Sequence, residues 1–322
     1  MEMRDKSRHG VLAALDVFLR TVHWRPVASF RYHMGYTPNL AWPRTWHEKM
    51  LWRKLIDRNP QFVVFCDKLA TKEFIRSRVP DLKIPETLWV GQVLEAAPRE
   101  LINAEVVIKT NHGSSFNYFP ARESLKYEEL FQRFEGWMKK TYGVKEREWG
   151  YSGVERKIFI EQLVPVAPGS ELLDISIECT DGRAIYGYIT IRQKMAGKKL
   201  NNYSPAGEEI RLYGKYQGEE HRLPDYLQVR ENFLQAVRLA EVLSRGMDYV
   251  RVDFLGNGAE LYAGEITCYP MSGIFKPTPE GETGTDTLVN PCWDIGKSWF
   301  LHNPQTGWKG SYAEQLRRAL SL

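Results

Sequence analysis

The sequence predicts an α+β protein whose strands pair mainly antiparallel. Segments with apolar residues at helical spacing alternate with short strand-like runs. Two long runs, LLDISIEC and AIYGYITIRQ, follow one another without an intervening helix, and residues 249–267, YVRVDFLGNGAELYAGEIT, are typical of a hairpin around a Gly-Asn-Gly turn. Strands joined by short turns pair antiparallel, so this order does not fit a doubly wound parallel sheet.

The N-terminal part of the chain is expected to be mainly helical, and strands follow it. Residues 45–79 predict two helices, because apolar side chains recur at helical spacing and Asn59-Pro60 interrupts them. A short strand is expected at 84–90. A second strand at 105–110, EVVIKT, runs directly into the small-residue turn NHGSSFNYF.

The remaining elements are read in the same way from periodicity and turn residues. In chain order we expect a helix at 124–143, a strand KIFIEQLV at 157–164, the two long strands at 172–179 and 184–193, a loop rich in Lys and Asn, a helix at 226–246 and the hairpin. At 322 residues, the chain is long enough for two or three subdomains that share a substantial core.

Composition describes an ordinary folded protein with an uneven charge. Apolar residues make up 43% and the net charge is +4, but residues 1–60 hold eleven Lys or Arg against five Asp or Glu. A basic region of this kind suits contact with anionic lipid at the inner membrane face or with an acidic glycan. The alternative is that these charges simply form a solvated helix face. We expect no nucleic-acid partner.

The cysteines and the apolar N-terminal stretch both favour a cytoplasmic protein. The four cysteines form no C-x-x-C pair and no compact zinc-ligand set with the histidines. The stretch VLAALDVFLRTV carries Asp16 and Arg20 and is far shorter than a membrane span, so a helix packed on the domain is expected there.

The hairpin carries charges that a half-buried strand pair does not need. Arg251 and Asp253 share one strand face, and pairing brings Glu265 opposite them. A surface ion pair is the simpler explanation. A divalent cation held by hard oxygen ligands, with the arginine beside a phosphate, is the other.

The usual nucleotide motifs are missing, but another phosphate-binding set is present. DIGKS at 294–298 is not a P-loop, because the first glycine would fall at Pro291, and no G-x-G-x-x-G precedes a helix. Lys109, however, lies inside an apolar strand, where an ammonium group is costly to bury without an anion. The turn that follows offers backbone N–H groups and hydroxyls to phosphate oxygens, and Lys68 comes from a preceding helix.

The order of these parts resembles the ATP-grasp superfamily and, more narrowly, the TupA-like ATP-grasp amidoligases named for teichuronic acid biosynthesis. The strings that carry this resemblance across about residues 39–276 are WPRTWHEKMLWRKLIDRNP, DKLATKEFI, VIKTNHGSS, FIEQLV, DYVRVDF and GEITCYPMSG. It implies an ATP-grasp fold with a mainly helical region at 1–80, a nucleotide-binding subdomain with the phosphate loop at 81–165, and a second subdomain with the metal site and a C-terminal extension at 166–322.

The resemblance also implies roles for individual residues. Lys68 and Lys109 would contact the phosphates of ATP, and Arg251 would meet the transferred phosphoryl group. Asp253 and Glu265 would bind Mg²⁺. The closing loop and the adenine hinge would be formed by Gly113, Ser114, Ser115, Glu161, Gln162 and the backbone at Leu163.

Some positions depart from the family's pattern or stay open. Thr267 stands where many ATP-grasp enzymes have an asparagine ligand, which leaves a second Mg²⁺ open. Lys194, Lys198 or Lys199 in the basic loop would reach a phosphate, or the loop is simply solvated. Substrate contacts are expected at Ser272 and Gly273, and His112 is either a substrate contact or a polar turn residue.

The reaction implied by the resemblance is ATP-dependent joining of a carboxylate to an amine through an acyl phosphate. The carboxylate or amine would belong to a small molecule or a surface polysaccharide precursor. An ATP-grasp kinase that phosphorylates a sugar or another small acceptor is the alternative, and a non-catalytic nucleotide-binding protein is the second rival.

Overall fold

The structure, a computed structural model, describes residues 2–167, 170–191, 199–212, 221–224, 229–274 and 285–321, with side chains from residue 10 onward. Its helices are α1 (Glu2–Val22), α2 (Trp24–Met34), α3 (Trp46–Leu55), α4 (Gln61–Cys66), α5 (Lys68–Arg78), α6 (Tyr127–Lys139), α7 (Arg230–Leu243), α8 (Asn290–Cys292), α9 (Trp299–His302) and α10 (Trp308–Leu320). Its strands are β1 (Thr87–Gly91), β2 (Val106–Thr110), β3 (Asn117–Tyr118), β4 (Ile158–Gln162), β5 (Leu173–Thr180), β6 (Arg183–Ile191), β7 (Leu200–Tyr203), β8 (Glu209–Ile210), β9 (Val250–Gly256) and β10 (Leu261–Thr267).

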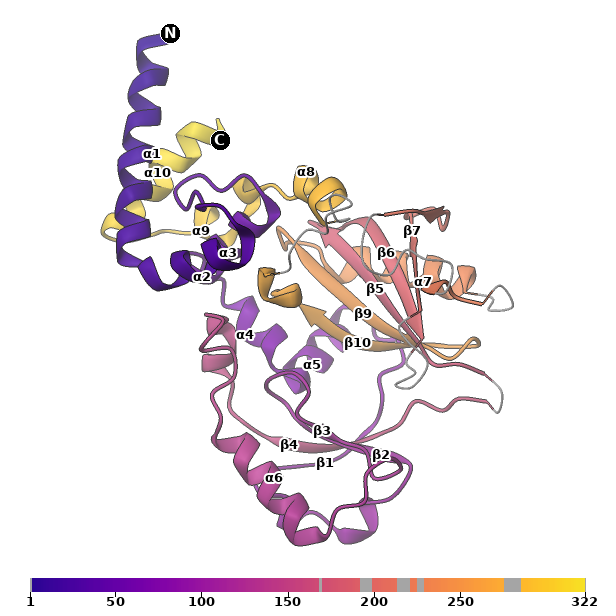
Figure 1. Ribbon diagram of the computed structural model, residues 1–322. Helices are drawn as coiled ribbons and strands as arrows, with labels where there is room; N and C mark the ends of the chain where they lie inside the picture. Colours follow the sequence, from indigo (N-terminus) through magenta and orange to yellow (C-terminus); the bar gives the residue numbers. More distant parts are fainter. Residues whose placement is uncertain are drawn as a thin grey trace.

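The strands form two antiparallel sheets, as the sequence predicts. The small sheet has the order β1-β4-β2-β3, and the large sheet has the order β10-β9-β5-β6-β7-β8. Figure 1 shows the small sheet with α6 at the bottom, the large sheet at the right, and α1, α3 and α10 at the upper left. Helices α4 and α5 lie between the sheets (Figure 1).

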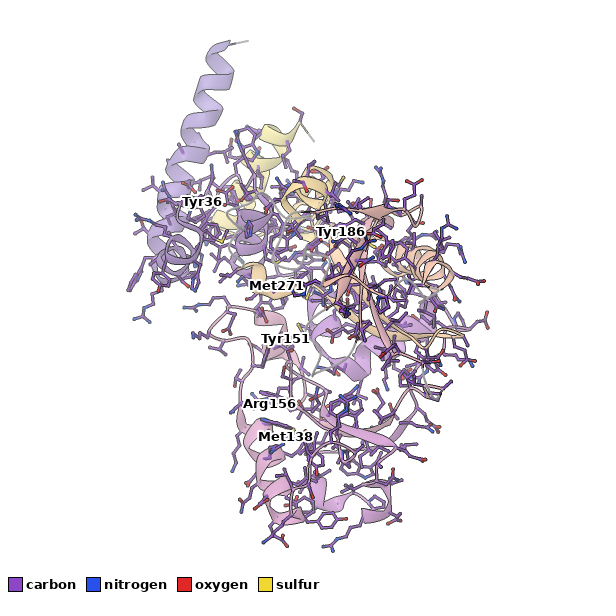
Figure 2. All side chains as sticks on the ribbon, turned by 45° about the vertical axis from the view of Figure 1, so that its right-hand side comes forward. Tyr36, Met138, Tyr151, Arg156, Tyr186 and Met271 are labelled. Atoms are coloured by element: carbon purple, nitrogen blue, oxygen red, sulfur yellow. The ribbon has the colours of Figure 1, made fainter. Side chains whose placement is uncertain are left out.

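The small sheet packs one face against α6 and carries its charged residues on the other. Val106 and Ile108 of β2 are buried in a cluster with Leu130 and Phe134 of α6. Because side chains alternate along a strand, Lys109 projects to the opposite face. Arg156, just before β4, donates to the Met138 carbonyl oxygen at 2.7 Å and so ties the sheet to the end of α6 (Figure 2).

The large sheet follows the same rule, with α7 on its apolar face. Ile177 lies opposite Val252 in the register, and both are buried in the cluster that contains Phe233 of α7. The helix packs so close that a Cβ on Gly187 would lie 2.8 Å from the Phe233 ring. The other face therefore carries the alternate residues of β5 and β9, which include the charged ones.

The helical end joins the two ends of the chain in one core. α1 and α10 contact each other, and Trp52 of α3 donates through Nε1 to the Tyr312 hydroxyl at 2.7 Å. The fully buried Arg53 then connects α3 to the base of the hairpin, since it donates to Asp248 Oδ1 at 2.7 Å and to the Cys268 carbonyl oxygen at 2.9 Å. No described helix combines the length and the apolarity that a membrane crossing requires.

Two boundaries differ from the sequence prediction for a physical reason. Residues 45–79 form three helices rather than two, because Asp67 is extended at φ −100° and ψ 109° and separates α4 from α5. Its carboxylate caps α5 by accepting from Leu69 N at 2.9 Å and Ala70 N at 3.3 Å. The helix predicted at 124–143 is limited to Tyr127–Lys139.

Candidate functional site

A β-bulge decides which way the acidic end of β10 faces. Leu261 and Ala263 are buried, so strict alternation would also bury residue 265. The register instead shifts between Ala263 and Ile266, and Ile266 becomes the buried residue. Glu265 is consequently exposed, on the same side as Thr267.

The bulge requires a glycine. A Cβ on Gly264 would lie 2.5 Å from the Asp253 carbonyl oxygen on the neighbouring strand, which no side chain tolerates without a backbone shift. Close approach of β9 and β10 at this point brings Glu265 towards Asp253. The glycine is therefore part of how the site is built.

Thr267 connects the two carboxylates predicted to bind a metal. Its hydroxyl lies 3.2 Å from Asp253 Oδ2 and 3.4 Å from Glu265 Oε1. Arg251 holds Asp253 through two donors, Nε to Oδ1 at 2.7 Å and Nη2 to Oδ2 at 2.8 Å. Ser176 on β5 donates to Oδ1 at 2.6 Å. The structure thus brings Arg251, Asp253 and Glu265 together on one face.

A buried glutamate that the sequence reading missed lies behind this group. Glu178 is 2% exposed, lies opposite Arg251 in the register and accepts a hydrogen bond from the Tyr249 hydroxyl at 2.7 Å. Burial raises its pKa to about 7, although the charge of Arg251 opposes the shift. The signal in the sequence was an acidic residue within the apolar strand LLDISIEC.

On the small sheet, one carboxylate holds two lysines. Glu161 pairs with Lys109 through one oxygen and with Lys72 Nζ at 2.6 Å through the other. Burial alone would raise the pKa of Glu161, but the two ammonium groups outweigh it and hold the pKa below its usual range. Burial lowers the pKa of Lys72, whose Nζ also donates to Pro85 O and Thr87 Oγ1. Lys72 was missed, although it follows Lys68 by four residues on the same helix face.

The small-residue turn after β2 is closed by Lys68. Lys68 donates from Nζ to the Gly113 carbonyl oxygen, and burial lowers its pKa. The negative charge of Glu265 opposes this lowering of the Lys68 pKa, and the positive charge of Lys109 adds to it. Ser114 and Ser115 at the tip are exposed.

The conformation of this turn is left-handed at two points. Gly113 has φ +80°, and a Cβ there would lie 2.9 Å from the Tyr142 ring. Ser115 has φ 64°, which is uncommon for a residue with a side chain. The turn is pinned at its base, where Thr110 N donates to the Phe116 carbonyl oxygen at 3.0 Å.

The hinge residues lie at the end of β4, an inner strand of the small sheet. Gln162 N donates to Glu86 O at 2.9 Å, and Leu163 N donates to Glu105 O at 2.9 Å. The Glu161 side chain is occupied by its lysines, whereas the Gln162 side chain is exposed. An adenine contact at this hinge would therefore come from Gln162 or from a carbonyl oxygen.

The turn after β10 contains the other predicted substrate residues. Met271, Ser272 and Gly273 all have left-handed φ values, 47°, 56° and 66°. A Cβ on Gly273 would lie 2.2 Å from Met50 Cγ, so glycine is required here. The buried Lys54 donates to the Ser272 carbonyl oxygen at 2.8 Å, and burial lowers its pKa to about 8 while Glu148 opposes the shift.

The remaining predicted site residues are His112 and the lysines of the basic loop. His112 is 1% exposed and packs edge-on against Phe116 at 5.8 Å, and burial lowers its pKa. Lys199 donates to the Arg222 carbonyl oxygen at 3.4 Å. Lys194 and Lys198 lie outside the described residues.

The oxygen atoms at the hairpin suit a magnesium ion that arrives with nucleotide. Within the described residues, no three His, Cys, Asp or Glu side chains are grouped as an all-protein metal site. The carboxylates of Asp253 and Glu265 both lie near the Thr267 hydroxyl. Mg²⁺ typically takes one or two carboxylates together with substrate phosphates. Asp253 and Glu265 fit that role.

Solved structures of ATP-grasp ligases resemble this chain at low identity. D-alanine–D-alanine ligase from Bacillus anthracis in complex with ATP is 15% identical, with 79% of this chain and 65% of that chain covered and a TM-score of 0.37. The corresponding ligase from Helicobacter pylori is 15% identical, with 76% and 68% covered and a TM-score of 0.39. The ATP-grasp ligase PsnB with a phosphomimetic precursor variant, Mg and ADP is 15% identical, with 76% and 63% covered and a TM-score of 0.39.

The family match, rather than these structures, identifies the chain. The chain spans less than two thirds of the length of the Bacillus anthracis ligase and of the PsnB ligase that it resembles. A comparison with curated proteins gave no match. The family described as TupA-like ATPgrasp matches residues 48–287, which include both sheets and every charged group described above. The chain therefore belongs to the TupA-like ATP-grasp family.

Proposed function

We propose that this protein is an ATP-dependent carboxylate–amine ligase that forms an amide through an acyl phosphate. The observation that supports this best is that each of the two sheets carries a group of charged side chains. Lys109 and Glu161 come from the small sheet, and Arg251, Asp253 and Glu265 come from the large one. Lys68 adds a cation at the turn after β2, where it donates to the Gly113 carbonyl oxygen, and the charges of Glu265 and Lys109 both act on its pKa.

In the first step, a carboxylate oxygen of the substrate attacks the γ-phosphorus of ATP. The bond to the β–γ bridging oxygen breaks, and ADP leaves. Lys68 and Lys109 would hold the phosphates, while the turn at Gly113 would cover them. When bound, Mg²⁺ would neutralise phosphate charge at Asp253 and Glu265.

In the second step, an amine attacks the acyl carbon, loses a proton and expels inorganic phosphate. We propose that Arg251 meets the transferred phosphoryl group, a role that the position of its guanidinium beside Asp253 supports. In the present arrangement both donors are occupied by that carboxylate. Arg251 would exchange one of these bonds for a phosphoryl oxygen once Asp253 takes up its metal.

The substrates that we propose are a carboxylate and an amine, one of them part of a surface polysaccharide or its precursor. The basic composition of residues 1–60 suits an anionic glycan, and it also suits contact with the inner face of a membrane. We accordingly propose a cytoplasmic reaction with ATP and Mg²⁺.

A hydroxylamine trap distinguishes the ligase from the alternative kinase. With ATP, Mg²⁺, hydroxylamine and a uronic acid or an N-acetylated amino acid, but no other amine, a ligase should yield a hydroxamate. With the amine partner in place of hydroxylamine, it should release ADP and phosphate in equal amounts. A stable phosphorylated product without hydroxamate would establish the kinase. Lys109→Ala serves as the control, since it should abolish either product.

A further inference from the structure

A solvent-accessible cavity lies between the helical end and the turn that follows the hairpin. It has a volume of about 230 Å³ and adjoins a second cavity of about 450 Å³. Arg25, Pro26, Lys54 and Arg147 line both, so the two form one continuous depression. Its size approaches that of small-ligand sites.

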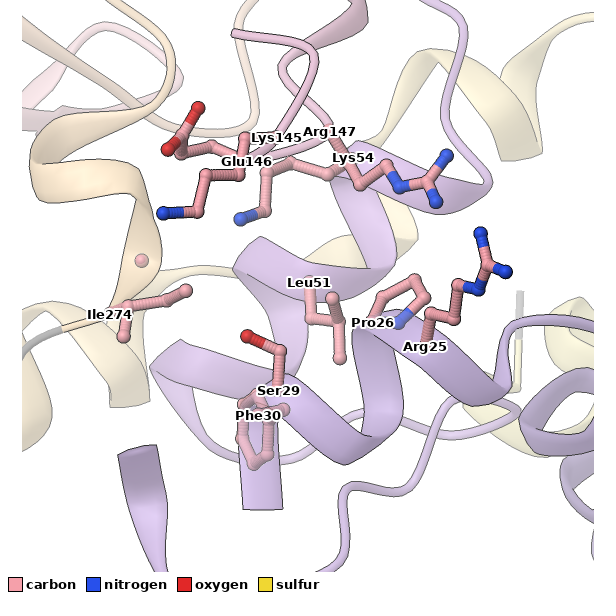
Figure 3. A pocket seen from close by; sticks show the side chains of 11 residues that line it. Arg25, Pro26, Ser29, Phe30, Leu51, Lys54, Lys145, Glu146, Arg147 and Ile274 are labelled. Carbon is pink, nitrogen blue, oxygen red and sulfur yellow. The ribbon is translucent and has the colours of Figure 1, made fainter. Parts of the chain in front are cut away.

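The walls of this cavity are strongly cationic. Arg25, Lys145 and Arg147 are exposed, and none of them forms an ion pair with a carboxylate in the part of the chain that the structure describes. Figure 3 shows the guanidinium groups of Arg25 and Arg147 projecting towards each other from opposite walls. Glu146 is the acidic residue of the lining, and Arg58 adds a further cation in the adjoining part.

The backbone around the cavity is held in uncommon conformations. Arg147 has φ 63°, and Met271 and Ser272 have φ 47° and 56°. Of the six non-glycine residues with positive φ among those described, these three line or border the cavity, and Ser115 belongs to the phosphate turn. Such strain concentrates at binding sites, where surrounding contacts maintain it.

The cavity borders the turn that follows the hairpin. The turn Pro270–Gly273 follows β10 after only Cys268 and Tyr269, and Gly273 lines the cavity. Lys54 connects the cavity to this turn, because it lines the cavity and donates to the Ser272 carbonyl oxygen. A substrate held here would therefore lie beside the turn that leads away from the proposed metal site.

We infer that this cavity binds a phosphate group of the glycan-type substrate, an inference that rests on the proposed ligase function. Three unpaired cations suit a dianion better than a single carboxylate, and arginine forks match phosphate oxygens. The exposed apolar side chains of Val22, Trp24 and Val144 border the adjoining part. They suit a sugar ring or the base of a lipid chain attached to that phosphate.

Glucose 1-phosphate titrated calorimetrically into the nucleotide-free protein tests this inference. Because Arg25→Gln/Arg147→Gln removes the charge-assisted hydrogen bonds of two guanidinium groups, it should lower the affinity at least tenfold. Arg238→Gln/Arg245→Gln removes two exposed arginines elsewhere and should change it less than twofold. Lys109→Ala, which weakens the proposed nucleotide site, should also leave it within twofold.

A second arm replaces the sugar phosphate by vesicles of phosphatidylglycerol or of neutral phosphatidylcholine. Binding to phosphatidylglycerol alone, lost in Arg25→Gln/Arg147→Gln, would support a lipid-borne phosphate, and glucose 1-phosphate binding alone would support a soluble one. No binding of either probe by the wild type overturns the inference. Loss of binding in Lys109→Ala with retention in the double variant also overturns it, since the phosphate would then occupy the nucleotide site. Failure of the hydroxylamine trap would leave these binding results unaffected.

Discussion

Gly264→Ala should disrupt the proposed metal site without changing any charged group. The new Cβ would lie 2.5 Å from the Asp253 carbonyl oxygen and 3.0 Å from its carbon, both of which are backbone atoms that cannot rotate away. The strands must separate locally, and such overpacking costs about 1–3 kcal/mol of unfolding free energy. The shift would also move Glu265 away from Thr267, from which it is 3.4 Å distant.

The expected consequence is a loss of magnesium-dependent nucleotide binding. Calorimetric titration of ADP with and without Mg²⁺ would measure it, and we expect the enhancement by Mg²⁺ to fall about tenfold, the equivalent of roughly 1.4 kcal/mol. Turnover should fall further, since a misplacement of about 1 Å can cost on the order of 10²-fold.

Gly136→Ala is the matched control, because its Cβ meets nothing within 4 Å inside α6. It should stabilise the protein by about 0.5–1 kcal/mol through helix propensity and leave ADP binding unchanged. Wild-type magnesium enhancement in Gly264→Ala, with the expected gain in Gly136→Ala, would refute the view that the bulge positions Glu265.

Three further predictions concern the charged groups. Asp253→Asn should reduce turnover by orders of magnitude with a modest loss of ADP affinity, whereas Lys109→Ala should weaken ADP binding itself; near-wild-type turnover in both would mean that the active site lies elsewhere. Glu161→Gln leaves two lysines without their shared partner and should lower the unfolding free energy by about 3–5 kcal/mol in urea titration, against under about 1 kcal/mol for Glu155→Gln, whose side chain is 67% exposed. The pKa of Glu178 is raised to about 7 from 4.5, so the folded state holds this proton more tightly than the unfolded state, and the unfolding free energy falls as pH rises from about 4.5 to 7. Glu178→Gln has no such group to titrate, so its unfolding free energy should fall by about 3 kcal/mol less over this range. Parallel pH profiles of stability for the wild type and the variant would contradict this prediction.

Local sequence patterns predicted most of the elements and several residues of the candidate site, although β7 and β8 lie where a loop was expected. Alternation along YVRVDF placed Arg251 and Asp253 on one face, because that face is decided within three residues. Lys109 stood out because an apolar strand gives an ammonium group no solvent. The order of motifs led to the family that the match over residues 48–287 identifies.

Contacts between distant segments could not be read in this way. Alternation alone would have buried Glu265, and only the bulge with its close approach to Asp253 turns the carboxylate outward. In the sequence, Lys72 could not be distinguished from the other cations of its helix, because its partner Glu161 lies on a distant strand, β4.

The tertiary structure also decided what lies behind and beside the hairpin. Glu178 faces Arg251 because β5 and β9, separated by about 70 residues, pair in one register. The cationic cavity gathers Arg25, Arg147 and Gly273 from three separate parts of the chain. A sequence specifies such neighbours only through the packing of whole elements, whereas strand alternation and helix periodicity are properties of the local backbone.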